Sequence, residues 1–161
     1  MSPLNRNLAI LVAEDDESYA LLLKRAFGEI DLTNPLHLLC DGQEVIDYLA
    51  GIGKYADRTS YPLPGMMVLD LKMPRVDGFE VLRRVKSDPA LRSIPIVMLT
   101  SSRHDPDVRR SYSLGANGYI VKPMDLAQYT KVLQDFGRFW LEVNETPPET
   151  KDFAHAASEN E

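Results

Sequence analysis

Residues 8–17 read Leu-Ala-Ile-Leu-Val-Ala-Glu-Asp-Asp-Glu. The first six of these residues form a short apolar run without alternation, which is typical of a strand buried on both faces of a parallel sheet. Four acidic residues end the run abruptly. From residue 18 to residue 30 apolar residues recur at helical spacing, which predicts an amphipathic helix. The chain therefore opens with a strand followed by a helix.

The same alternation continues along the chain. Further strands are predicted over residues 35–40, 66–69, 94–99 and 118–121. Helices are predicted over residues 42–50, 78–87, 105–115 and 126–143, starting at acidic caps or at a proline in the first turn. Residues 51–65 contain three Gly and two Pro and show no period, which indicates a long connecting loop. Alternating strands and helices predict an α/β fold, with a doubly wound five-stranded parallel sheet covered on both faces.

Length and composition fit one ordinary folded domain. The chain has 161 residues, of which 44% are hydrophobic and 26% are charged, close to the average for globular proteins. No apolar run approaches the length of about 20 residues that spans a bilayer, and residues 1–10 lack the pattern of a signal peptide. Cys40 has no second cysteine to pair with, and its apolar neighbours favour a small buried thiol. We therefore expect a cytoplasmic protein without membrane contact.

The net charge of −6 is unevenly distributed. Residues 142–161 hold six acidic side chains and one lysine, so they carry most of it. The remaining chain is nearly neutral and has no basic stripe, which disfavours nucleic-acid binding. The acidic end is rich in Pro, Glu and Asn, a composition typical of disorder. We therefore divide the chain into a domain over residues 1–143 and a disordered acidic tail over residues 144–161.

Polar residues follow four of the five predicted strands, where ligands bind in such sheets. They are Glu14 with Asp15, Asp70, Thr100 and Lys122. Three carboxylates from adjacent strand ends repel each other unless a cation lies between them, and such hard oxygen ligands suit Mg²⁺. Alternatively, Glu14 and Asp16 are solvated helix caps. A lysine and a hydroxyl at the same edge could contact an anion held at Asp70.

Four stretches together carry a resemblance to a known family. They are residues 10–16 (Ile-Leu-Val-Ala-Glu-Asp-Asp), 68–78 (Val-Leu-Asp-Leu-Lys-Met-Pro-Arg-Val-Asp-Gly), 94–101 and 115–123. Through them the chain resembles the receiver domain of response regulators, the CheY-like family of bacterial two-component signalling. The resemblance implies a flavodoxin-like sheet with strand order 2-1-3-4-5 and five helices.

The resemblance also implies a phosphorylation site. Asp70 would accept a phosphoryl group from the phosphohistidine of a histidine kinase. Asp15, Asp70 and the backbone carbonyl of Lys72 would bind Mg²⁺, and Glu14 would bind it directly or through water. Lys122 would pair with the phosphoryl group. The protein would not be a conventional enzyme, because it would catalyse only its own phosphorylation and dephosphorylation.

Several further roles follow from the same resemblance. Thr100 and Tyr119 would form a switch that moves upon phosphorylation. Lys72 and Ser102, each two residues after a site residue, would tune the lifetime of the phosphoryl group. The peptide bond before Pro123 would be cis.

A narrower similarity concerns the partner. The long loop over residues 51–65 and the extension of the last helix through residues 139–141 resemble single-domain regulators that partner phytochrome-type histidine kinases. No DNA-binding domain is expected, so the output would be contact with a downstream protein.

The last predicted helix has a long apolar stripe. Its residues Tyr129, Leu133, Phe136 and Trp140 recur at helical spacing, which favours core packing. Phe139, Trp140 and Val143 lie beyond the cover that a compact receiver needs, so they could form a face for homodimerisation or kinase docking.

The residues disfavour two other functions. A haloacid-dehalogenase-like phosphatase also uses an aspartyl nucleophile and Mg²⁺, but it needs a second acid two residues later, where this chain has Lys72. A flavodoxin-like flavin carrier needs a phosphate loop rich in Ser, Thr and Gly after the first strand, where residues 14–17 are acidic. The receiver is therefore the favoured interpretation.

Overall fold

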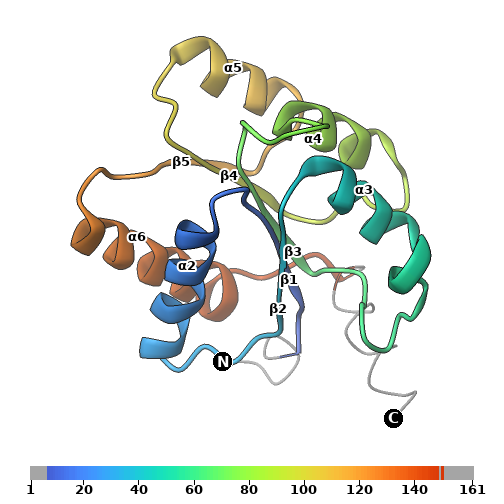
Figure 1. Cartoon of the computed structure of the whole chain (residues 1–161), viewed down its shortest axis with the longest axis horizontal. Coiled ribbons are helices and arrows are strands. Elements are labelled where there is room, and N and C mark those ends of the chain that lie inside the picture. Colours follow the sequence, from blue (N-terminus) through green and yellow to red (C-terminus); the bar gives the residue numbers. More distant parts are fainter. Residues whose placement is uncertain (1–6, 149, 151–161) are drawn as a thin grey trace.

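The computed structural model describes residues 7–148 and residue 150. Strands and helices alternate along this part of the chain (Figure 1), as the sequence predicts. The strands are β1 (Ile10–Ala13), β2 (Leu36–Leu39), β3 (Met66–Leu69), β4 (Ile96–Thr100) and β5 (Gly118–Val121). The helices are α2 (Glu17–Glu29), α3 (Gly42–Ala50), α4 (Gly78–Ser87), α5 (Asp105–Ser113) and α6 (Leu126–Arg138).

The strands form one parallel sheet in the order β2-β1-β3-β4-β5, which confirms the predicted topology. The register aligns the carboxyl ends of the central strands. Ala13, the last residue of β1, lies opposite Leu39 of β2 and Leu69 of β3. Thr100 at the end of β4 lies opposite Val121 at the end of β5. Residues that follow these strands therefore meet at one edge of the sheet.

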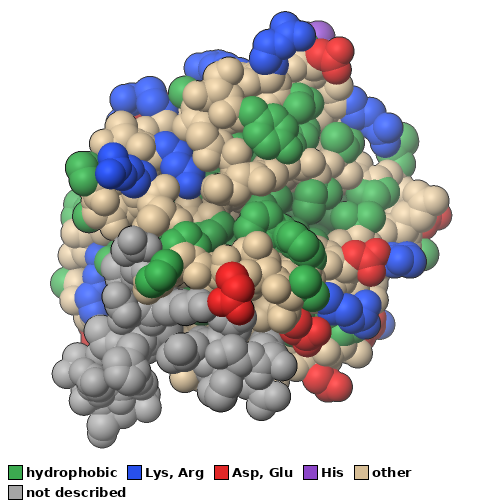
Figure 2. All heavy atoms as spheres, turned by 180° about the vertical axis from the view of Figure 1, so that it is seen from behind, with side chains coloured by type: hydrophobic (Ala, Val, Ile, Leu, Met, Phe, Trp, Pro, Cys, Tyr) green, Lys and Arg blue, Asp and Glu red, His purple; other side chains and the backbone are tan. Residues whose placement is uncertain are grey.

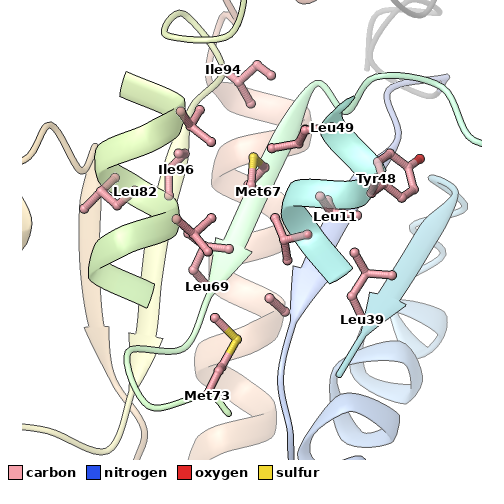
Figure 3. Packing of buried hydrophobic residues seen from close by; sticks show 14 of the residues in the cluster. Leu11, Leu39, Tyr48, Leu49, Met67, Leu69, Met73, Leu82, Ile94 and Ile96 are labelled. Atoms are coloured by element: carbon pink, nitrogen blue, oxygen red, sulfur yellow. The ribbon is translucent and has the colours of Figure 1, made fainter. Parts of the chain in front are cut away.

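Helices cover both faces of the sheet: α2 and α6 lie on one face, and α3, α4 and α5 on the other (Figure 1). Figure 3 shows the core under α3 and α4, a single buried cluster that includes Leu11 and Met67 of the sheet and Leu82 of α4. A second core on the opposite face includes the stacked rings of Phe27 and Phe136. Alternate residues of each central strand enter opposite cores, which explains why these strands are apolar throughout.

Acidic side chains cap α2, α3, α4 and α6 where the sequence predicts them, whereas α5 starts at Asp105 with Pro106 and has no side-chain cap. Asp41, Asp77 and Asp125 each accept a hydrogen bond from the backbone N–H three residues later, at 2.8 to 2.9 Å. Asp16 caps α2 by accepting from the N–H of Ser18 at 2.9 Å. Asp16 is thus a helix cap, which confirms for this residue the alternative to a role in cation binding.

The connection after α3 is more ordered than its sequence indicates. It contains the 3₁₀ helix η1 (Gly53–Ala56). Tyr55 and Tyr61 pack with Tyr48 of α3, with ring centroids 5.0 to 6.0 Å apart. The guanidinium group of Arg58 donates hydrogen bonds to three backbone carbonyls of this region. Aromatic packing and one arginine therefore hold a segment that has no helical or strand period.

The chain continues past α6 as a π-helix, η2 (Phe139–Val143). Tyr129, Leu133 and Phe136 are buried, which confirms core packing for this part of the stripe, and Trp140 is half-buried. Phe139 and Val143 are 49% and 69% exposed. The described part of the chain contains no helix that is long and apolar enough to span a membrane.

The environment of Cys40 differs from the prediction. Cys40 is exposed, so the predicted burial of its thiol is wrong. It follows the last paired residue of β2, an edge strand, and precedes the cap of α3.

Within the predicted tail, Thr146 and Thr150 are buried, whereas residue 149 and residues 151–161 lie outside the described residues.

Candidate functional site

The ends of β1 and β3 bring three carboxylates together. The N–H of Glu14 donates to the carbonyl of Leu39 (3.0 Å) and that of Asp70 donates to the carbonyl of Ala13 (3.1 Å), which extends the sheet ladder one residue past the strands. Carboxylate oxygens of Glu14, Asp15 and Asp70 all lie within 4.8 Å of one another. Glu14 and Asp70 are buried and Asp15 is exposed. The predicted juxtaposition at this edge is confirmed.

Lys122 reaches the same place from the end of β5. Its N–H donates to the carbonyl of Thr100 at 2.7 Å, which continues the ladder between β4 and β5. The side-chain Nζ donates to Oε2 of Glu14 at 2.5 Å and to Oδ2 of Asp70 at 2.9 Å. The lysine was expected opposite Asp70, but its bond to Glu14 was not expected. The buried ammonium group thus bridges two carboxylates.

Burial and charge oppose each other in this cluster. Burial raises the pKa of the Glu14 carboxyl, and Lys122 opposes part of that effect. Burial alone would lower the pKa of Lys122, but its hydrogen bonds to Glu14 and Asp70 raise it instead. Lys122 is therefore a firmly charged ammonium group. Three carboxylates still face one ammonium, and this excess negative charge attracts a cation.

The donor set fits a hard divalent cation. Asp15 is exposed at the rim, where a partly hydrated ion can reach it. Oε1 of Glu14 accepts a hydrogen bond from the N–H of Asp16 at 3.1 Å. The N–H of Lys72 donates to Oδ1 of Asp70 at 3.3 Å, so the Lys72 backbone lies against this carboxylate. Mg²⁺ prefers oxygen ligands, and it is usually bound by one or two carboxylates while it keeps several waters. The clustered carboxylates at the exposed rim fit this preference.

Of the two predicted switch residues, Thr100 ends β4 and Tyr119 lies in β5. Both form a hydrogen bond with Ser102. Oγ1 of the buried Thr100 accepts from the N–H of Ser102 at 3.4 Å. The hydroxyl of Tyr119 donates to the Ser102 carbonyl at 2.9 Å, and burial raises the pKa of this phenol. The Ser102 hydroxyl donates to Oδ2 of Asp107 at 2.6 Å. Ser102 thus links both switch residues to the first turn of α5, a role its sequence position did not indicate.

The peptide bond before Pro123 departs from expectation. No peptide bond in the described residues is cis, so the predicted cis bond at Pro123 is wrong. An Xaa–Pro bond favours trans by about 0.5–1 kcal/mol unless other contacts select the cis isomer. Lys122 reaches both carboxylates with the trans bond.

The loop between β3 and α4 is fixed at both ends. A Cβ added to Gly78 would lie 2.2 Å from the carbonyl oxygen of Asp70, so only glycine permits this approach. Arg75 has a left-handed φ of 66°. Its guanidinium group makes a two-pronged ion pair with Asp41, with N–O distances of 2.8 to 3.1 Å. The loop that follows Asp70 is therefore held against the cap of α3.

Replacing Gly78 with Ala should destabilise the protein by about 1–3 kcal/mol, because the new methyl group meets the Asp70 backbone. Urea denaturation would measure the change. Gly28→Ala in α2 is the matched control. Apart from the neighbouring residues and backbone of its own helix, no atom lies within 4 Å of its added Cβ, so it should stabilise the helix by about 0.5–1 kcal/mol. Equal effects of the two substitutions would contradict the close contact.

Comparison with known proteins decides the family. The model of the response regulator receiver domain matches residues 10–134. The chain belongs to the response regulator receiver family. The probable methanogenesis regulatory protein FilR2 of Methanothrix harundinacea is 38% identical to this receiver over 138 residues, which cover 86% of each chain. Response regulator Rcp1 of Synechocystis sp. is 35% identical over 138 residues, covering 86% of the receiver and 92% of Rcp1.

Solved structures agree with this assignment. The phosphorylated cyanobacterial phytochrome response regulator RcpA superposes on the receiver with a TM-score of 0.82 at 34% identity, covering 87% of the receiver and 98% of RcpA. The Mn²⁺-bound form of Rcp1 gives a TM-score of 0.81 at 34% identity, covering 87% and 99%. Both similarities extend over nearly the whole of the other chain.

Membership of this family fixes the general role. Receiver domains are phosphoacceptor signalling domains of two-component systems and not conventional enzymes. They bind a divalent metal, and those of phytochrome response regulators are phosphorylated by histidine kinases. The alternative of a haloacid-dehalogenase-like phosphatase finds no support in the comparisons.

Proposed function

We propose that this receiver accepts a phosphoryl group on Asp70 from the phosphohistidine of a histidine kinase. Mg²⁺ would be held by Asp15, Asp70 and the backbone carbonyl of Lys72, with Glu14 binding directly or through water. One observation carries the proposal: three carboxylates from two strand ends have oxygens within 4.8 Å of one another, beside the Nζ of Lys122.

The residues have distinct roles in the transfer. An oxygen of Asp70 attacks phosphorus while the bond from phosphorus to the histidine nitrogen breaks, and the bonding electrons return to the imidazole. Mg²⁺, when bound, neutralises charge on the phosphoryl oxygens. Lys122 already donates to Oδ2 of Asp70 at 2.9 Å, so its ammonium group is in place to donate to a phosphoryl oxygen there. Catalysis is mainly positioning and charge stabilisation.

The signal leaves the site through the residues around Ser102. Thr100 turns its hydroxyl towards the phosphoryl group and Tyr119 follows, which changes the surface of α5, β5 and α6 that a downstream protein meets. Lys72 and Ser102 tune the lifetime of the phosphoryl group. The contacts of Ser102 with Thr100, Tyr119 and Asp107 support this route.

The kinase is proposed to be of the phytochrome type, acting in the cytoplasm. Support comes from RcpA, a cyanobacterial phytochrome response regulator that matches nearly the whole described fold. The loop that contains η1 and the extension η2 are the two features that first indicated this partner.

Incubation with acetyl phosphate tests the function. The wild-type protein should gain one phosphoryl group by intact-mass analysis when Mg²⁺ is present, and none when EDTA replaces it. Absence of any gain with Mg²⁺, both from acetyl phosphate and from a phosphorylated phytochrome kinase, would refute the proposal.

The face that includes Phe139, Trp140 and Val143 is proposed to join two copies of the receiver. Figure 2 shows hydrophobic side chains running as a band across the side of the molecule that is turned away in Figure 1. Light scattering of the wild type should give the mass of a dimer, and Val143→Glu should give a monomer. Ile52→Glu is the control, because Ile52 is a similarly exposed apolar residue in another part of the fold. A monomeric wild type, with and without beryllofluoride, would exclude the dimer.

A further inference from the structure

Lys122 has a third neighbour besides its two carboxylates. Its Nζ lies 4.5 Å from the centroid of the Tyr19 ring in α2. A cation within about 6 Å of an aromatic face is attracted by the negative charge of that face. The Lys122 side chain is only 5% exposed, and exclusion of water strengthens this attraction. Nothing in the sequence indicated this role for Tyr19, because an aromatic residue in an amphipathic helix is typical of ordinary core packing.

The Tyr19 ring packs against the core. Tyr19 meets Tyr129 edge to face, with ring centroids 5.6 Å apart and an interplanar angle of 77°. Tyr129 is almost fully buried in the core between the sheet, α2 and α6. The Tyr19 ring is therefore a fixed surface, with its partner anchored in α6 and the Lys122 ammonium near its face.

This arrangement restricts where the ammonium group can go. Nζ donates to Glu14 and to Asp70, and the Tyr19 ring bounds it from another side. Without the ring, the ammonium group could stay with the Glu14 carboxylate, which is not phosphorylated, and move away from Asp70. With the ring, Nζ stays within reach of Oδ2 of Asp70.

We propose that Tyr19 is a positioning residue for phosphoryl transfer, because its ring holds the Lys122 ammonium group beside the Asp70 carboxylate, which is the proposed phosphoryl acceptor. The inference rests on the proposed function of Asp70. It concerns a residue that acts through Lys122 and does not itself touch the phosphoryl group. The attraction comes from the face of the ring, so the phenol hydroxyl is dispensable.

The test varies the charge of the ring face at constant shape. Position 19 is filled in turn with Phe and with its 4-fluoro, 3,5-difluoro and 3,4,5-trifluoro derivatives, and the rate of phosphorylation by acetyl phosphate and Mg²⁺ is measured. Phe should keep the rate within about twofold of wild type. The logarithm of the rate should then fall steadily with fluorine number, by about fivefold to tenfold in total, because an attraction of about 1 kcal/mol is being removed. A purely structural role predicts no such trend, because the rings differ little in size.

Two controls separate the possible failures. The same series at Tyr112, which is exposed on α5, should leave the rate unchanged. Proton NMR gives a readout independent of the reaction: the Lys122 ε-methylene signals should be shifted upfield by the Tyr19 ring and return to ordinary positions in Tyr19→Leu. Equal rates for the Phe and trifluoro proteins, in samples that are phosphorylated, would overturn the role of Tyr19 alone. A wild type that is never phosphorylated would overturn the proposed function as well.

Discussion

Replacing Asp70 with Asn should abolish phosphoryl uptake and leave the fold intact. The amide is isosteric with the carboxylate but is not a nucleophile, and it offers one fewer anionic ligand to the cation. Lys122 would keep its bond to Glu14, so no buried charge would lose its only partner. The substitution also relieves repulsion among three clustered carboxylates. Without Mg²⁺, the melting temperature should therefore equal or exceed that of the wild type.

Intact mass after treatment with acetyl phosphate and Mg²⁺, together with thermal unfolding, would check this result. The matched control is Asp77→Asn, seven residues further along the same loop. Asp77 caps α4 by accepting from the N–H of Glu80, a role that Asn also fulfils, so this variant should be phosphorylated like the wild type. Phosphorylation of Asp70→Asn would show that the acceptor is another residue.

Replacing Lys122 with Met should have the largest effect on stability. It removes the one ammonium group that bridges Glu14 and Asp70 while leaving both carboxylates buried. Breaking a buried ion pair from one side costs about 3–5 kcal/mol, because the remaining charge loses its compensation. A divalent cation can restore part of this compensation, so Mg²⁺ should stabilise the variant more than the wild type. Phosphorylation should also slow, because no ammonium group meets the phosphoryl oxygens.

Urea denaturation of both proteins, with and without MgCl₂, would measure these differences. Lys131→Met is the matched control, because Lys131 makes an exposed ion pair with Asp135 at 2.9 Å. Exposed pairs of this kind contribute about 0–1 kcal/mol. If the two lysine variants lost equal stability, or if Mg²⁺ stabilised Lys122→Met no more than the wild type, the bridging role of Lys122 would be contradicted.

The sequence predicts the backbone of the site well because the sheet itself places it. Apolar runs mark the strands, and parallel pairing sends their carboxyl ends to one edge. Glu14, Asp70 and Lys122 each follow such a run directly, so their meeting needs no information beyond the strand order. The caps at Asp41, Asp77 and Asp125 are equally local, since each depends on residues three positions apart.

Contacts between side chains were harder to predict. The bond from Lys122 to Glu14 and its approach to Tyr19 depend on which way long side chains turn inside the assembled core. The tyrosine cluster of the η1 region has no periodicity to reveal it, because its residues pack from a loop. Burial of Cys40 was predicted from apolar neighbours, but the residue lies just past the paired end of an edge strand. The bond before Pro123 depends on tertiary contacts that its dipeptide does not encode.

The lysine that bridges the acidic cluster follows β5, and it lies 108 residues after Glu14, the first carboxylate that it contacts. A ribosome makes the chain from its amino end, so Glu14, Asp15 and Asp70 emerge well before Lys122. A nascent chain that has reached only β4 holds mutually repelling acids and no bridging ammonium group. Closing the loop between Glu14 and Lys122 also costs conformational entropy, which grows slowly with loop length. The Lys122 bridge to Glu14 and Asp70 therefore forms only after residue 122 has been made and β5 has joined the sheet.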